Sequence, residues 1–243
     1  MISVEERGAV SVVRFENGPV NVLDLDTLKE LTSTLGGLAD APAIVLTGAG
    51  RAFSAGVDLK RLYEGGESYT REFLLALGGA FRAVFDHPRP MVAAVNGHAI
   101  AGGCVIAAGC DYRFMSGGTI GVTELLVGVP FPATALEAVR YVVGPRTAAL
   151  VNTGRTLRPD EALAVGLVDE VVAPEGLLDA ALARAEAFAA IPAVSFAMTK
   201  AALRADASRL MAGDNTDEVI EVWSSPTVRA AISGYLERLA RRG

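Results

Sequence analysis

Apolar and polar residues follow two different periods along the first 95 positions of the chain. Some segments alternate one by one or form short apolar runs, which is typical of half-buried and buried strands. In other segments an apolar residue returns every three or four positions, as on the buried face of a helix. The expected strands are 2–15, which folds back at Glu6-Arg7-Gly8, then 20–23, 43–46 and 91–95, and the expected helices are 27–39 and 70–85. This alternation favours an α/β fold of repeated ββα-like units.

The second half of the chain becomes increasingly helical. Strands are expected at 112–115, 119–122 and 167–172, and helices near 133–142, 146–152 and from Arg158 onward. After Pro174 the pattern is helical throughout, with breaks at Ile191-Pro192, Gly213 and Ser225-Pro226. We therefore divide the chain into a core, 1–174, and a helical region, 175–243, with a role in oligomerisation. Within the core, 51–60 is expected to be a small-residue loop and 63–69 a mobile stretch.

The rest of the chain is organised around residues 90–111. An apolar strand breaks there at Asn96-Gly97, and a helix of small residues begins after Gly102-Gly103. Such a turn places backbone N–H groups at a helix N-terminus, where they and the helix dipole favour negative charge. We expect a substrate to be held against this turn.

A membrane span is an alternative for residues 91–110, whose only strongly polar side chains are Asn96 and His98. Four glycines interrupt this run and no basic cluster flanks it closely, so a buried strand and helix explain it better. The chain begins directly with a strand pattern and shows no signal peptide. We therefore expect a cytoplasmic protein without a membrane partner.

Composition narrows the class of protein. A chain of 243 residues can bury a sizeable core, and a hydrophobic content of 51% suggests that further apolar surface is buried between subunits. The net charge of −6, without a basic stripe, argues against nucleic acid as the main partner. Cys104 and Cys110 are six positions apart, so we expect no disulfide between them. Neither cysteine has a metal-ligand spacing, and no metal site is expected.

Three segments resemble motifs of the crotonase superfamily, the enoyl-CoA hydratases and isomerases, and the resemblance covers nearly the whole chain. They are Ala52 to Lys60, with its Phe53-Ser54-Ala55-Gly56 run, Asn96 to Asp111, with its glycine pair, and Thr156 to Val171, with Gly166-Leu167-Val168. The resemblance implies a ClpP-like spiral of ββα units with a helical C-terminal trimerisation region. It also implies an acyl-CoA thioester substrate, a homotrimer or hexamer, and no cofactor, since CoA is part of the substrate.

The resemblance also implies an oxyanion hole made by the backbone N–H groups of Val57 and Gly102. Removing a proton next to a thioester carbonyl puts negative charge on its oxygen, and a preorganised donor is worth about 3 kcal/mol there. A side chain at position 102 would crowd the thioester, which is a reason for glycine. Taken alone, Gly102 would be read as a packing glycine in a turn.

Hydratases of this family use two glutamates, and this sequence matches only one of the two positions. Val105 stands where the first glutamate is expected, and Ala101 replaces the first of three glycines. The second glutamate matches Glu124, within 120–128. From the local sequence alone, Glu124 would be read as a carboxylate at the start of a helix, where the helix dipole stabilises it. As a single base beside an oxyanion hole, it suits isomerisation, moving a proton from C2 to C4 of a 3-enoyl-CoA.

Neighbouring residues favour the same reaction. Val105 and Phe131 are expected to keep water away from Glu124, which suppresses hydration and raises the pKa of the carboxylate. The runs at 110–113 and 235–239 look more like Δ3,Δ2-enoyl-CoA isomerases than hydratases. The predicted function is therefore isomerisation of 3-enoyl-CoA to trans-2-enoyl-CoA in fatty acid metabolism.

The resemblance gives a less specific picture of CoA binding. The expected contacts are the backbone around Ala55, Asp58 and Leu59, with Phe53 packing beneath the adenine and Lys60 or Lys200 near the phosphates. The helix at 70–86 and the loop before it are expected to shape the acyl pocket. From the residues themselves, we expect Asp58 to cap its loop, His98 to line the core or the pocket, and His87 to lie in a loop.

Other functions compete with this prediction. A weak or specialised hydratase needs a second acid from outside the matched position, and a non-catalytic acyl-CoA-binding member leaves Glu124 without a role. A Clp-type serine protease shares the spiral fold but needs a serine nucleophile in the glycine segment and a downstream histidine. The chain has Cys104 there and no histidine after His98. A dinucleotide-binding fold is excluded because no G-x-G-x-x-G follows a strand.

Overall fold

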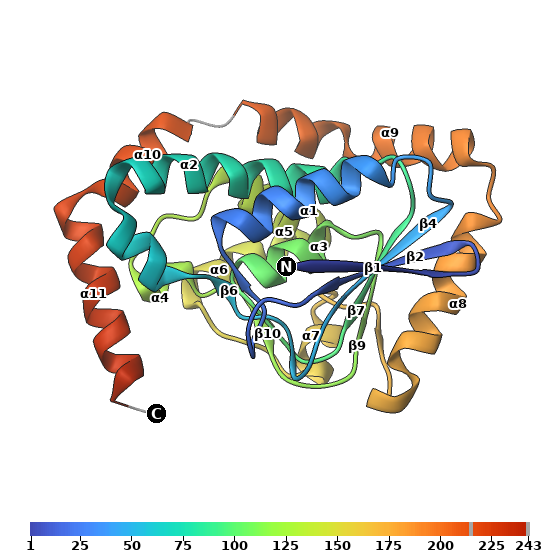
Figure 1. Ribbon diagram of the computed structural model, residues 1–243, viewed down its shortest axis with the longest axis horizontal. Helices are drawn as coiled ribbons and strands as arrows, with labels where there is room; N and C mark the ends of the chain where they lie inside the picture. Colours follow the sequence, from blue (N-terminus) through green and yellow to red (C-terminus); the bar gives the residue numbers. More distant parts are fainter. Residues whose placement is uncertain (214–215, 242–243) are drawn as a thin grey trace.

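Six strands form the central sheet in this computed structural model, which describes residues 1–213 and 216–241 (Figure 1). In spatial order they are β1 (Ile2–Arg7), β2 (Val10–Phe15), β4 (Ala43–Gly48), β7 (Met91–Val95), β9 (Tyr112–Met115) and β11 (Glu170–Val171). β1 and β2 pair antiparallel through the expected tight turn, where Gly8 has a φ of 62°. The other neighbours in this sheet pair in parallel.

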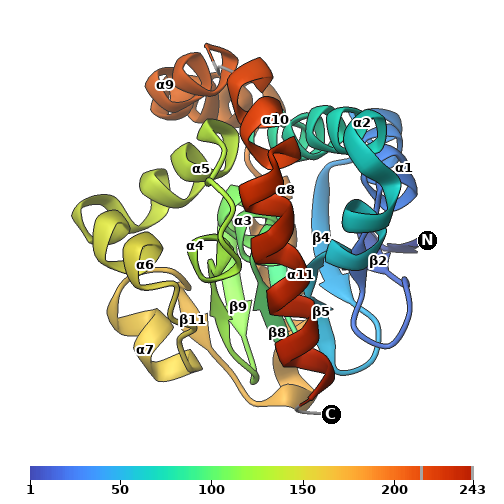
Figure 2. The same ribbon diagram turned by 90° about the vertical axis from the view of Figure 1, so that its left-hand side faces the viewer.

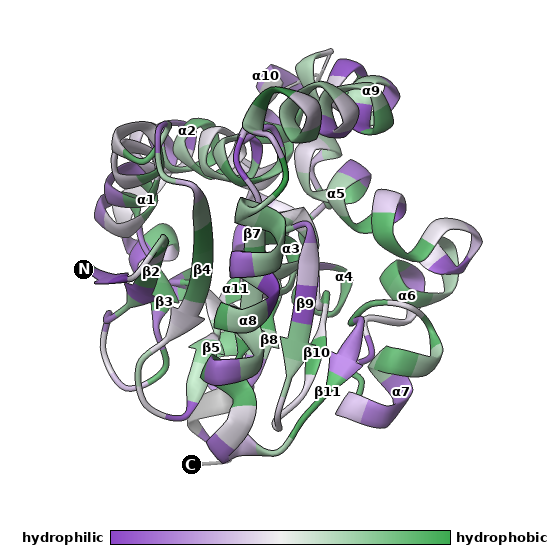
Figure 3. Cartoon of the chain, turned by 90° about the vertical axis from the view of Figure 1, so that its right-hand side faces the viewer, coloured by the Kyte–Doolittle hydropathy of each residue, from purple (hydrophilic) through white to green (hydrophobic). Residues whose placement is uncertain are grey.

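Helices cover both faces of this sheet, which explains its apolar strands. In β4, Ile44 and Leu46 face one hydrophobic core, while Ala43 and Val45 face another. Successive side chains of a strand point to opposite faces, so a strand buried on both sides is apolar throughout. The first face is covered by α1 (Leu25–Gly37), α2 (Leu59–Phe85), α3 (Gly102–Gly109) and α5 (Ala133–Val143). α8 (Leu177–Ala189) lies across β4, β7 and β9 on the second face (Figure 3).

Main strands continue into short strands before the chain enters a helix. β4, β7 and β9 lead to β5 (Ala52–Ser54), β8 (His98–Ile100) and β10 (Ile120–Gly121), which form a parallel sheet in the order β10-β8-β5. β3 (Val22–Leu23) and β6 (Gly56–Val57) pair in a further small sheet. The successions β4-β5-β6-α2, β7-β8-α3 and β9-β10-α4 (Glu124–Val127) are the predicted spiral of ββα units, so the fold class is confirmed.

Two expectations about the segment after β4 were wrong. The expected loop at 51–60 contains β5 and β6, and the expected mobile stretch at 63–69 belongs to α2, which begins at Leu59. Helical geometry is interrupted at Gly66, with φ 71° and ψ −168°. Tyr69 then stacks on Phe73, with ring centroids 6.1 Å apart. The segment is polar because it is part of an amphipathic helix, whose outer face meets solvent.

The remaining predicted elements agree with the structure. Asp24 caps α1, since its Oδ1 accepts a hydrogen bond from the Thr27 N–H at 2.9 Å. The other helices are α6 (Thr147–Thr153), α7 (Pro159–Ala164), α9 (Ala193–Ala212), α10 (Thr216–Ser224) and α11 (Pro226–Ala240). Cys104 and Cys110 are buried and unpaired. The apolar run 91–110 is β7, β8 and α3, and no helix in the described ranges is long and apolar enough to cross a bilayer.

The C-terminal helices pack onto different parts of the core. α8 covers the sheet, α9 packs chiefly against α5, α10 packs against α2, and α11 passes over α4 (Figures 1 and 2). The division of the chain at residue 174 into two functional units stays a prediction. Of its second unit, residues 214, 215, 242 and 243 lie outside the described part of the chain.

A buried cluster of charges ties α9 to the core. The Oδ2 of Asp111 accepts from Lys200 Nζ at 2.7 Å, and its Oδ1 accepts from Arg204 Nη2 at 2.8 Å. Arg204 also donates to the carbonyl oxygens of Phe85 and Gly109, where α2 and α3 end. Lys200 is 6% exposed and is held in this cluster, so the expectation that it could meet phosphates was wrong.

Replacing Asp111 with alanine should destabilise the fold strongly, because it leaves the Lys200 and Arg204 cations buried without their counter-ion. The expected loss is about 3–5 kcal/mol in the free energy of unfolding, measured by urea titration. Glu72→Ala is the control, since it removes only the exposed ion pair with Lys29 and should cost less than about 1 kcal/mol. Equal losses in the two variants would contradict a structural role for the cluster.

Candidate active site

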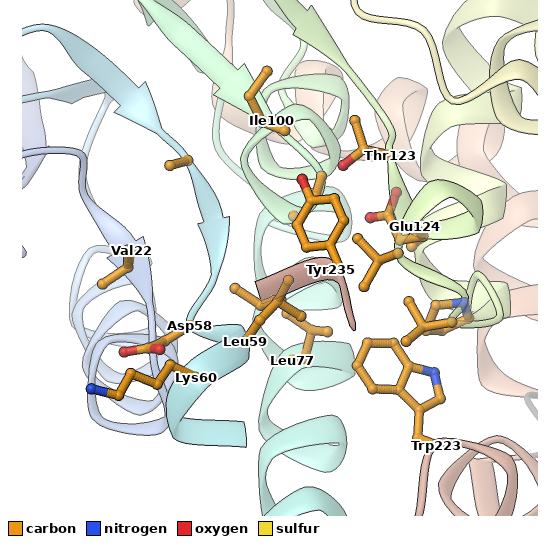
Figure 4. Close-up of a pocket in the computed structure, with 18 of the residues that line it drawn as sticks. Val22, Asp58, Leu59, Lys60, Leu77, Ile100, Thr123, Glu124, Trp223 and Tyr235 are labelled. Atoms are coloured by element: carbon orange, nitrogen blue, oxygen red, sulfur yellow. The ribbon is translucent and has the colours of Figure 1, made fainter. Parts of the chain in front are cut away.

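A cavity of about 270 Å³ lies between the starts of α2 and α3, the loop that begins at α4, and the C-terminal helices α10 and α11 (Figure 4). Three separate segments of the chain bring predicted site residues to it. Those that line it are Val57, Gly102, Glu124, Ala55, Asp58 and Leu59. The structure therefore brings these side chains and backbone groups together, while their chemical roles stay predictions.

The first predicted oxyanion donor, the Val57 N–H, belongs to β6, which lies beside the cavity. The Asp58 N–H donates to the Leu23 carbonyl oxygen in β3 at 3.1 Å. Neighbouring residues of an extended strand direct their N–H groups to opposite edges, so the Val57 N–H points away from β3. Gly56 has a φ of 84°, and a Cβ added to it would lie 3.5 Å from the Gly102 nitrogen. The backbone of β6 thus lies against the start of α3.

The second predicted donor belongs to the first residue of α3. The first helical hydrogen bond runs from the Val105 N–H to the Ala101 carbonyl oxygen at 3.1 Å, so the Gly102 N–H has no acceptor within the helix. Ala101, just before it, has φ 52° and ψ −121°. This conformation costs a non-glycine residue about 1–3 kcal/mol, and such strain gathers at functional sites.

Glycine at position 102 also has a packing reason. A Cβ added there would lie 3.0 Å from Leu23 Cδ1 and 3.5 Å from Phe81 Cζ. Phe81 lines the cavity, so a side chain at 102 would press on the cavity wall. At Gly103 the added Cβ would lie 2.5 Å from the Ser54 carbonyl oxygen, which shows how closely α3 approaches β5.

Glu124 enters the cavity from the first position of α4. Its Oε2 is shielded from solvent and has no hydrogen-bond partner. Burial raises the pKa of Glu124 to about 7, an effect that the backbone N–H groups of Glu124 and Thr123 partly oppose. No second carboxylate among the described residues contributes to this shift. A buried carboxylate with a free oxygen and a pKa near neutrality can accept a proton and return it.

Three predicted site residues do not line the cavity. Phe53 is fully buried, and its ring packs edge-on against Phe15 with centroids 5.6 Å apart, so its place beneath the adenine stays a prediction. Val105 is 1% exposed, because α3 is buried all round and only its first turn reaches the cavity. Phe131 packs against the core between two lining residues, Val129 and Pro132.

The charge of Glu124 affects the side chain of Cys104 in α3. Burial raises the pKa of its thiol, and the negative charge of Glu124 raises it further. The thiol therefore stays protonated at neutral pH and adds no charge beside the carboxylate.

The other end of the cavity is polar and open. Lys60, whose side chain is 75% exposed, and Asp58 lie there on the opposite side from Glu124 (Figure 4). Asp58 caps α2 as expected, since its Oδ1 accepts from the Arg61 N–H at 2.9 Å. His98 is exposed and bonded to Thr119, so the expectation that it lines the core or the pocket was wrong. His87 lies in the turn after α2, as expected.

Sequence reasoning missed the contribution of the last two helices. Trp223 of α10 and Tyr235 and Leu236 of α11 line the cavity. The predicted acyl-pocket helix does contribute, through Leu77 and Phe81 of α2. Trp223 is the single tryptophan of the chain, but no local pattern indicates that it folds back over a site formed about 100 positions earlier.

The buried carboxylate should make stability depend on pH. Its pKa is about 7 in the fold against an ordinary value of 4.5, so the folded chain binds more protons between these values. The free energy of unfolding should therefore fall as pH rises through this window. Glu124→Gln removes the free-energy cost of ionising a buried carboxylate. This variant should be more stable than the wild type by about 3 kcal/mol at pH 8, with little difference at pH 4. Urea titrations at both pH values measure this, and a pH-independent difference would contradict it.

Comparisons with known proteins identify the fold and the family. The sequence profile of the enoyl-CoA hydratase/isomerase family matches residues 5–241. The human mitochondrial enoyl-CoA delta isomerase 1 is 31% identical over 98% of this chain and 83% of its own. A putative enoyl-CoA hydratase of Thermus thermophilus is 38% identical over 84% of each chain. The crystal structure of human mitochondrial delta3-delta2-enoyl-CoA isomerase superposes with a TM-score of 0.93 at 31% identity, covering 99% of this chain and 98% of that one.

Among the described residues, no group of histidine, cysteine or carboxylate side chains is arranged to hold a metal ion.

One of these relatives is named an isomerase and the other a hydratase, and both names give enoyl-CoA as the substrate. The profile match over nearly the whole length, the relatives and the shared spiral agree: this chain belongs to the enoyl-CoA hydratase/isomerase family.

Proposed function

We propose that this protein isomerises 3-enoyl-CoA to trans-2-enoyl-CoA with Glu124 as its single base. The observation that carries the proposal is the lone buried carboxylate, whose Oε2 has no hydrogen-bond partner and whose pKa is raised to about 7. At neutral pH a sizeable fraction of Glu124 is ionised and can take a proton, and its acid form is strong enough to give the proton back.

In the proposed reaction the Glu124 carboxylate removes a proton from C2 of the substrate. The electron pair of that C–H bond moves toward the thioester, which becomes a dienolate with negative charge on its oxygen. The N–H groups of Val57 and Gly102 are the proposed donors to this oxygen, and the start of α3 adds its dipole. Protonated Glu124 then delivers the proton to C4, so that the double bond moves from C3–C4 to C2–C3. Proton and electrons balance, and no cofactor takes part.

The cavity walls support isomerisation over hydration. Most residues around Glu124 are apolar, among them Val127, Val129 and Phe81. Such walls exclude the water that a hydratase must activate. CoA is proposed to lie at the open end, against the backbone of Ala55 to Leu59, with Lys60 near its phosphates.

Hydration is the second candidate, because several relatives are named hydratases. It requires a second acid or base near Glu124. Asp58 is the other carboxylate that lines the cavity within residues 1–213 and 216–241, and it caps α2 on the opposite side. The geometry therefore favours the isomerase. A non-catalytic acyl-CoA-binding protein would bind substrate without turning it over.

We also propose that the chain assembles with copies of itself as a homotrimer or hexamer. Large apolar side chains are exposed along α9, with Val194 66%, Met198 70% and Leu203 67% exposed. An apolar surface of this kind on a soluble protein marks an interaction surface. A second copy of the chain would cover it.

The catalytic proposal predicts that Glu124→Gln loses isomerase activity by roughly 10²–10⁴-fold, because the amide cannot accept the C2 proton. For the wild type, kcat/KM should rise about tenfold per pH unit below pH 7 and level off above it, as Glu124 ionises. Assays with a 3-enoyl-CoA measure both effects, and Glu72→Gln, an exposed carboxylate outside the cavity, should keep full activity. Rapid hydration of a 2-enoyl-CoA by the wild type would overturn the single-base mechanism.

The assembly proposal predicts a change of mass in solution. Light scattering coupled to gel filtration should give three or six chain masses for the wild type and a smaller species for Met198→Glu, because a charge would be buried in the interface. Val4→Glu, at an exposed apolar position on β1, should not change the mass. A monomeric wild type would contradict the proposal.

A further inference from the structure

The cavity has one open polar end and one closed apolar end. Lys60 marks the open end with a side chain that is 75% exposed. At the closed end Trp223, Val129 and Ala135 are each at most 2% exposed. Trp223 lies on the opposite side of the lining residues from Lys60 (Figure 4). If CoA lies at the open end, as proposed above, an acyl chain joined to it would extend toward Trp223.

Trp223 is fixed in place at the closed end. Its Nε1–H donates a hydrogen bond to the Pro130 carbonyl oxygen at 3.2 Å. Pro130 belongs to the loop between α4 and α5 that also supplies Val129 to the cavity. A buried indole whose N–H has an acceptor keeps one orientation, with its apolar ring available for contact. The bond thus joins α10 to the loop that follows Glu124.

We propose that Trp223 closes the acyl end of the cavity and sets the longest acyl chain that the site accepts. This rests on the proposed function, which makes the ligand an acyl-CoA. Each CH₂ group buried in an apolar cavity tightens binding about fourfold. When the chain reaches the indole, the next CH₂ group finds no space and affinity stops rising.

The size of the cavity indicates the class of substrate. An apolar cavity of about 150 Å³ is known to hold benzene, so one of about 270 Å³ has room for roughly ten atoms of carbon size. Part of this room holds the thioester group. The inferred substrates are short- to medium-chain 3-enoyl-CoA esters of roughly six to eight carbons.

The single tryptophan makes the inference directly measurable. All indole fluorescence of this protein comes from Trp223, so its emission reports contact at the closed end. Titration with CoA and with saturated acyl-CoA esters from two to sixteen carbons should leave the emission unchanged for CoA and acetyl-CoA. The emission should shift once the chain is long enough to touch the indole. Identical responses to acetyl-CoA and octanoyl-CoA at saturation would overturn the proposal.

Variants at position 223 test the limit on chain length. Calorimetric titration of the wild type should show affinity that rises to octanoyl-CoA and then levels or falls. Trp223→Leu should bind dodecanoyl-CoA at least tenfold tighter relative to octanoyl-CoA than the wild type does, because the removed ring opens space. Trp223→Phe keeps an aromatic ring but loses the hydrogen bond to Pro130. The longest acyl chain that it accepts should change less than in Trp223→Leu.

Phe85→Leu is the matched control, an aromatic-to-leucine change at a fully buried position of α2 outside the cavity. It should leave the chain-length profile unchanged, whereas an equal shift in this variant would make the effect one of general loosening. An unchanged profile in a folded Trp223→Leu protein would overturn the proposal, as would failure of every acyl-CoA to bind.

Binding of saturated esters involves no chemistry, which separates the two proposals. A shifted chain-length profile without isomerase activity would uphold the role of Trp223 and overturn the proposed reaction. Isomerase activity with an unchanged chain-length profile would uphold the proposed reaction and overturn the role of Trp223.

Discussion

The close approach of β5 and β6 to the end of β8 and the first turn of α3 is the constraint on which the candidate site depends. Two backbones can lie this near each other only where no side chain stands between them. Gly56 of β6 and Gly103 of α3 meet that condition, since an added Cβ would lie 2.6 Å from the Ile100 carbonyl oxygen at Gly56 and 2.5 Å from the Ser54 carbonyl oxygen at Gly103. The donors proposed at this contact are backbone N–H groups, so their positions follow from the spiral itself. In the proposed reaction, this preorganisation would stabilise an oxyanion without rearrangement.

The burial of Glu124 opposes stability and favours the proposed chemistry at the same time. A carboxylate with an unpaired oxygen in an apolar cavity favours its neutral form, which is why its pKa is about 7. An exposed glutamate, with its ordinary pKa of 4.5, would be ionised throughout the neutral range but would be a weaker base toward a carbon acid. The two hydrophobic cores on either side of the sheet and the Asp111 cluster hold the fold around this unfavourable group.

The C-terminal helices connect the site with the outer surface. α9 is anchored to the core by Lys200 and Arg204, while Val194, Met198 and Leu203 of the same helix are exposed. The next two helices, α10 and α11, return over the cavity and supply Trp223 and Tyr235.

Sequence reasoning identified the strands of the central sheet, most of the helices and six of the residues that line the cavity, because these follow from local patterns. Period-two alternation gave β1 and β2, apolar runs gave β4 and β7, and the glycine pair marked the start of α3. The motif around Ala55 to Leu59 and the glutamate at 124 could be placed for the same reason. Short strands such as β6, with two residues, are too brief to show a period and were read as loop.

By itself, then, the sequence determined the α/β spiral, the family and a single carboxylate without the second glutamate of a hydratase. Only the tertiary structure decided which candidates reach the cavity. Phe53, Val105 and Phe131 pack into or against the core, whereas Trp223, Tyr235 and Leu236 close the site from helices about 100 positions downstream. The physical reason is that the spacing of apolar residues along the sequence shows which side chains are buried, but not which distant element buries them. That choice depends on how whole helices pack, which no local pattern encodes.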